Sequence, residues 1–131
     1  MASELAAWAD ATPPEAGRKS SFRPVDLVHL SRYTLGDRAL EREVLELFCA
    51  QSSIYLERLR AAGSDQEWND AAHSLKGSAS AIGAWRAAAA AERAEGLSGD
   101  ANTQRRAIRL RELEAALHEA NLYIGALLAD R

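Results

Sequence analysis

The spacing of apolar residues in the C-terminal part of the chain limits its fold more than any other feature. Leucine, alanine and isoleucine recur there at alternating intervals of three and four residues, at Leu110, Leu113, Leu117, Ala120, Ile124 and Leu127. These intervals place the apolar side chains on one face of an α-helix, and they are typical of the seam between helices in a bundle. We therefore predict a long helix here that packs through this face.

Similar patterns predict helices upstream. Segment 37–62 carries a continuous apolar stripe with charged residues outside it, and Asp37 and Gly63 are suitable residues to begin and end its helix. Ser64 or Asp65 is expected to cap the next helix, which runs to a break at Gly83. The expected helices cover 25–35, 37–62, 64–82, 84–95 and 102–129, with a turn at 96–100.

No segment of adequate length shows the alternation of a β-strand, and the connections between the helices are short. Short connections make sequential helices antiparallel. The chain is therefore predicted to be all-α, an up-down-up-down antiparallel four-helix bundle with a short N-terminal capping helix, formed by residues 25–131. Residues 1–24 include a Pro/Gly/Lys/Ser-rich stretch and are predicted to be a tail, either flexible or with a short extra helix.

His73 lies on the wrong face of its predicted helix to belong to the core. At about 100° per residue, the apolar side chains of segment 64–82 fall within one arc, and His73 points away from it. Lys76 shares this polar face one turn further on. An exposed imidazole is a candidate nucleophile, and the ammonium group can neutralise an anionic group that the ring accepts.

Gly77 supports a site on this face. A glycine within a helix costs about 1 kcal/mol relative to alanine. Because residues four apart are neighbours on a helix, Gly77 leaves bare backbone beside His73 and allows a bulky reactant to approach. A histidine, a cation and a cleared approach suit phosphoryl transfer, in which a neutral ring nitrogen attacks phosphorus and Lys76 stabilises the charge.

The run A-H-S-L-K-G-S-A-S-A-I-G at 72–83 resembles the signature of the histidine phosphotransfer (HPt) domain family. The resemblance extends over roughly residues 25–129. It implies a phosphocarrier without kinase activity, which relays a phosphoryl group between receiver-domain aspartates in a two-component phosphorelay. His73 would be the phosphoacceptor and Lys76 the charge-stabilising cation.

The polar face and the family resemblance suggest roles for further residues. The residues expected to form the receiver-docking surface are Asn69, Gly77, Ser80 and Ala84. Ser78 and Gly83 match family positions that support the site by packing or orientation. The expected partners are receiver domains of a hybrid histidine kinase and of response regulators, with the protein itself a monomer. No cluster of carboxylates is apparent that would hold Mg²⁺, so no cofactor of its own is expected, and Mg²⁺ is expected on the partner receiver.

Composition excludes some other functions. A net charge of −3 and a pI of about 5.6 argue against a nucleic-acid-binding surface. The cluster Arg105, Arg106, Arg109 and Arg111 is interpreted as a solvated helix face, with contact to an acidic partner as the alternative. The single cysteine, Cys49, is interpreted as a packing residue. No basic leader or membrane-length apolar run occurs, so the expected location is the cytoplasm, without membrane association.

Three alternatives remain. The chain can be an adaptor bundle without phosphoryl chemistry, or an isolated phosphoacceptor module of a chemotaxis-type kinase, although the initiating Met1 favours an independent protein. A di-metal bundle needs inward-facing carboxylate and histidine pairs, whereas Asp70 and His73 both face outward. His29 and His118 lack a comparable setting and are interpreted as structural or solvated.

Overall fold

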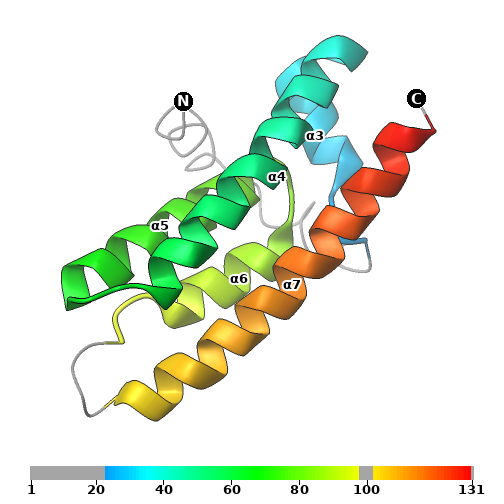
Figure 1. The fold of residues 1–131 in the computed structure, drawn as a ribbon. Helices are drawn as coiled ribbons and strands as arrows, with labels where there is room; N and C mark the ends of the chain where they lie inside the picture. The colour runs from blue at the N-terminus through cyan, green and yellow to red at the C-terminus, as the bar shows by residue number, and fades with distance from the viewer. Residues whose placement is uncertain (1–22, 98–101, 131) are drawn as a thin grey trace.

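The computed structural model describes residues 23–97 and 102–130. Over these residues the chain forms helices and no strands, so the all-α prediction is confirmed (Figure 1). The predicted tail at 1–24 and the turn at 96–100 fall largely outside the described residues. The observed ends lie at the expected positions or within one or two residues of them. The helices are α3 (Leu27–Thr34), α4 (Arg38–Arg60), α5 (Asp65–Ala81), α6 (Trp85–Ala94) and α7 (Thr103–Ala129).

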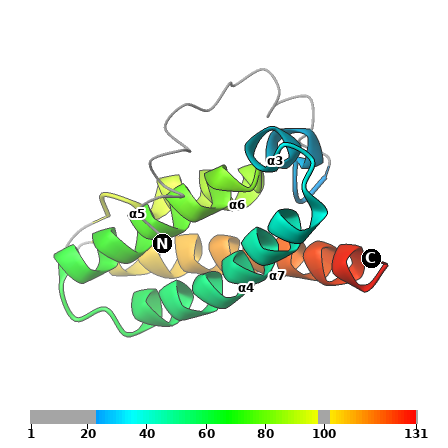
Figure 2. The same cartoon turned by 90° about the horizontal axis from the view of Figure 1, so that it is seen from above.

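The four longest helices pack into one bundle (Figures 1 and 2). Helix α4 contacts α5 and α7, and α6 contacts the same two helices. The buried side of α6 consists of alanines, which allow the neighbouring helices to approach closely. Large apolar side chains from the other helices fill the core, including Leu45, Phe48, Leu75, Leu113 and Ile124.

Local capping explains where two of these helices begin. The Asp37 carboxylate accepts a hydrogen bond from the backbone N–H of Leu40 at 3.1 Å, as predicted for the start of α4. Of the two candidate caps for α5, Ser64 is the one used, because its hydroxyl accepts from the backbone N–H of Glu67 at 3.2 Å. The sequence thus determines where the helix that carries His73 begins.

The junction between α5 and α6 also anchors the short helix α3. Gly83 has a positive φ of 78°, and its carbonyl oxygen accepts a hydrogen bond from the backbone N–H of Asp26 at 2.9 Å. A Cβ atom on Gly83 would lie 2.7 Å from the Asp26 Cβ. Glycine is therefore needed at this position both for the left-handed backbone and for the close approach of the segment before α3.

His29 is buried in the same region and has a structural role. Its side chain is 3% exposed, and its ring meets the indole of Trp85 edge-on with the centroids 4.8 Å apart. Burial lowers the pKa of His29 below its ordinary value, although the nearby Asp26 carboxylate opposes this shift. The structural interpretation of this histidine agrees with its position.

Candidate functional site

His73 projects from α5 into solvent. Its side chain is 68% exposed, whereas its neighbours Ala72 and Leu75 are fully buried. This difference follows from the amphipathic pattern of α5, because the apolar side chains turn toward α4 and α6. The predicted exposure of the imidazole is confirmed.

A carboxylate that the sequence analysis did not single out joins the two predicted site residues. Glu95 Oε2 lies 3.3 Å from His73 Nδ1, and Glu95 Oε1 lies 3.6 Å from Lys76 Nζ. Because an ionised carboxylate can only accept hydrogen bonds, the contact favours a proton on Nδ1 of the neutral ring. The lone pair then lies on Nε2, and an imidazole nitrogen with a free lone pair can act as a nucleophile.

Glu95 is the residue that directly follows α6. It is the C-cap of that helix and is 28% exposed. Sequence reasoning treated it only as the end of the 84–95 helix, because no periodicity within α5 relates it to His73. A usable signal was an acidic residue directly before Gly96, at the end of the helix that packs next to the site.

The predicted docking residues have different surroundings. Gly77 and Ser80 are partly exposed on α5, on the same helix as His73. Asn69 is also partly exposed, but its Oδ1 atom accepts a hydrogen bond from the backbone N–H of Gly96 at 2.7 Å, so part of its hydrogen-bonding capacity is used within the fold. The docking prediction is wrong for Ala84, which is 0% exposed and has no surface to offer a partner.

The docking prediction is wrong for Ala84 because α5 ends before this residue. The helix stops at Ala81, and the left-handed Gly83 turns the chain inward before α6 begins. Ser78 is 1% exposed, and Gly83 is buried at the junction, so both lie inside the fold rather than on the surface around His73. These positions suit the predicted support by packing.

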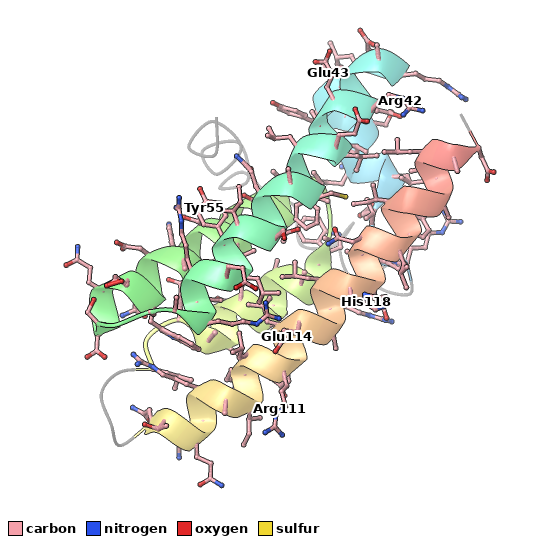
Figure 3. The ribbon with its side chains drawn as sticks, viewed as in Figure 1. Arg42, Glu43, Tyr55, Arg111, Glu114 and His118 are labelled. Carbon is pink, nitrogen blue, oxygen red and sulfur yellow. The ribbon has the colours of Figure 1, made fainter. Side chains whose placement is uncertain are left out.

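Other residues considered from the sequence lie away from His73. His118 projects from α7 beside a hollow between α4 and α7, near Glu114 (Figure 3). Cys49 packs partly buried against the core, and burial, followed by the nearby Glu46, raises the pKa of its thiol. Among residues 23–97 and 102–130, no group of three or more His, Cys, Asp or Glu side chains is placed to hold a metal ion.

The arginine cluster is not uniformly solvated. Arg106 is 20% exposed and its guanidinium lies 4.8 Å from the ring centroid of Trp68, so the solvated-face interpretation is wrong for this residue. Arg109 pairs with Glu112 at 2.9 Å. In the part of the chain that the structure describes, no helix is both long and apolar enough to cross a membrane.

A helical bundle that presents a histidine on an exposed face, with a lysine one turn away, has the form of a phosphotransfer module of two-component signalling. A family model described as the Hpt domain matches residues 43–126, and the chain belongs to this family. The resemblance seen in the sequence is thereby confirmed. Hpt domains are phosphocarriers rather than kinases, and they interact with receiver domains in phosphorelays. No curated protein and no solved structure matches the chain.

Proposed function

We propose that the protein relays a phosphoryl group between the aspartates of two receiver domains, with His73 as the phosphoacceptor. The observation that carries this proposal is an exposed imidazole whose Nδ1 atom contacts Glu95, a carboxylate that also forms an ion pair with Lys76. The other two histidines have no comparable setting. His29 is buried, and His118 lies on α7 beside a different hollow.

The chemistry follows from the positions of the three side chains. Nε2 of His73 attacks the phosphorus of an aspartyl phosphate in line, so that an N–P bond forms while the P–O bond to the aspartate breaks and its carboxylate leaves. The Nδ1 proton stays on the ring, where Glu95 balances the positive charge that develops. Lys76 stabilises the negative charge on the transferring oxygens.

The receiver is expected to approach over Gly77 and Ser80, which lie on α5 beyond His73 and are partly exposed. We expect the partners to be receivers of a hybrid histidine kinase and of response regulators. In this proposal Mg²⁺ is bound by the receiver, and the phosphocarrier is a cytoplasmic monomer.

We also propose the up-down-up-down arrangement for α4, α5, α6 and α7. Its support is the short connection on either side of α5 and the alternating direction of the coloured helices in Figure 1. This arrangement places the end of α6 beside the first half of α5, where Glu95 meets His73.

Label transfer tests the proposed function. The full chain is incubated with a receiver that carries a labelled aspartyl phosphate, in parallel with the His73→Gln and His118→Gln variants. Wild type and His118→Gln should take up an acid-labile, base-stable label, while His73→Gln takes up none. A wild-type chain that gains no label would instead be an adaptor, and a label that persists in His73→Gln would place the phosphoacceptor elsewhere.

A further inference from the structure

The turn that carries Glu95 is held by side chains from two other helices. Trp68 Nε1 donates a hydrogen bond to the carbonyl oxygen of Ala94 at 2.8 Å. The backbone N–H of Gly96 donates to Asn69 Oδ1 at 2.7 Å. The residues directly before and after Glu95 are therefore both attached to α5 by hydrogen bonds.

The third attachment comes from α7. Arg106 Nε donates to the carbonyl oxygen of Leu97 at 2.8 Å, and its guanidinium also binds Asp65 at 2.9 Å. The same guanidinium stacks over the Trp68 ring. Arg106 thus joins the turn after α6 to the first residue of α5.

These attachments matter because the backbone leaves the helix abruptly at Glu95. Glu95 has extended dihedral angles, φ −58° and ψ 144°, and Gly96 follows with a positive φ of 82°. The last carbonyl groups of a helix have no partners within it, and helix ends open more readily than helix centres. Side-chain hydrogen bonds to Ala94, Gly96 and Leu97 hold this end closed.

Helix α5 therefore carries His73 and also two of the side chains that hold the turn, Trp68 and Asn69. Asn69 precedes His73 by one helical turn on α5, and it holds the backbone of the residue next to Glu95. Glu95 in turn contacts His73 Nδ1. The contacts form a closed path from α5 through the turn and back to α5.

We propose that Asn69 and Arg106 are positioning residues that act through Glu95, and that their hydrogen bonds to the turn keep the proton of the neutral His73 ring on Nδ1. The consequence for phosphotransfer rests on the proposed function. The position of the ring proton does not depend on the proposed function, because it is a property of the protein alone. In a neutral histidine side chain without such a contact, the proton favours Nε2. Attack on phosphorus requires an unprotonated Nε2, so a less ordered turn would lower the fraction of His73 in the reactive tautomer.

The ring proton is measured by long-range ¹H–¹⁵N correlation spectra of the ¹⁵N-labelled full chain, at a pH above the titration of the ring. His73→Gln identifies the His73 signals. Asn69→Ala and Arg106→Ala should shift the His73 signals toward protonated Nε2. Asn69→Asp should remain close to wild type, since it retains an oxygen acceptor for Gly96, and Arg105→Ala serves as the matched arginine control. Unchanged His73 signals in Asn69→Ala, or equal shifts in Asn69→Ala and Asn69→Asp, would overturn the proposal.

A chemical donor then measures reactivity without a receiver. Phosphoramidate should phosphorylate His73 in Asn69→Ala roughly 2- to 10-fold more slowly than in wild type, the loss expected from one hydrogen bond. In a Glu95→Ala background, Asn69→Ala should have no further effect. An equal loss in both backgrounds would contradict an action through Glu95. Shifted ring signals combined with failure of the wild type to accept label from a phosphorylated receiver would support the positioning role and reject the proposed function.

Discussion

The buried carboxylate of Asp26 accepts a hydrogen bond from the indole Nε1 of Trp85 at 3.0 Å. Asp26 is also the N-cap of α3, where its other oxygen accepts from the backbone N–H of His29 at 3.1 Å. One side chain thus begins α3 and attaches it to the first residue of α6.

Replacing Trp85 with Phe removes one of these two hydrogen bonds and leaves a buried carboxylate oxygen without its partner. We expect the free energy of unfolding to fall by about 1–3 kcal/mol. Urea unfolding followed by circular dichroism measures the change. Equal stability of Trp85→Phe and wild type would show that the indole N–H contributes nothing to holding α3.

Gly83→Ala should destabilise the protein by about 2 kcal/mol or more, because the new Cβ would meet Asp26 and the backbone has a positive φ. Gly125→Ala is the matched control. Gly125 lies within α7, and a Cβ there meets nothing within 4 Å, so alanine should stabilise the helix by about 0.5–1 kcal/mol. Thermal unfolding of the two variants should therefore move the melting temperature in opposite directions.

The buried His29 makes stability depend on pH. Burial lowers its pKa in the folded state, so the unfolded chain binds a proton more readily once the pH falls below the ordinary value of 6.5. The free energy of unfolding should decrease as the pH falls below about 6.5, and the contribution of His29 should be fully present above it. The carboxylate of Asp26 and the guanidinium of Arg32 act on the ring in opposite senses. Urea unfolding between about pH 5 and 8 should show a weaker pH dependence in His29→Gln than in wild type, and parallel curves would contradict this origin.

Lys76→Ala should slow phosphotransfer without abolishing it, because the nucleophile remains when one stabilising charge is removed. A loss of roughly 10- to 1000-fold is expected. The fold should be retained, since the Lys76 side chain is 38% exposed and forms its ion pair with the partly exposed carboxylate of Glu95. Rapid-mixing measurements in both directions of transfer provide the test, and wild-type rates in both would show that the lysine is only a solvated side chain.

Gly77 separates helix stability from partner docking. Gly77→Ala and Gly77→Gln should stabilise the isolated bundle by roughly 0.5–1 kcal/mol if helix propensity dominates. Both should weaken receiver binding and slow transfer, with the larger effect for glutamine, because the side chain would occupy the approach beside His73. Thermal melts and receiver titrations are the measurements. A destabilised bundle with normal binding would mean that Gly77 serves packing instead.

The local features of the site follow from the sequence. The exposure of His73 and its proximity to Lys76 are properties of one helix, so the period of α5 is sufficient to predict them. The same counting failed at Ala84, because it extended the helical period beyond Ala81, where α5 ends. A helical wheel that is extended past the end of a helix assigns residues to a helix face to which they do not belong.

Contacts between helices required the structure. Glu95 is 22 positions from His73, and the distance between them depends on how α6 packs against α5. The acidic neighbours of Arg106 on an amphipathic helix favour a solvated side chain, yet the guanidinium contacts the Trp68 ring and donates to the carbonyl oxygen of Leu97. The composition and periodicity of one helix do not reveal which side chains of another helix will contact it.

When the His73 ring is neutral, the form that attacks in the proposed function, the site formed with Lys76 and Glu95 holds one cation and one anion and carries no net charge. A phosphoryl group on the ring would add up to about two negative charges, by analogy with other phosphorylated side chains. Under the proposed function, the surface that a receiver meets is therefore neutral before the transfer to His73 and negative after it. A loaded molecule repels a receiver that still carries its own phosphoryl group and accepts one whose aspartate is free, so the charge of the surface itself sorts donors from acceptors.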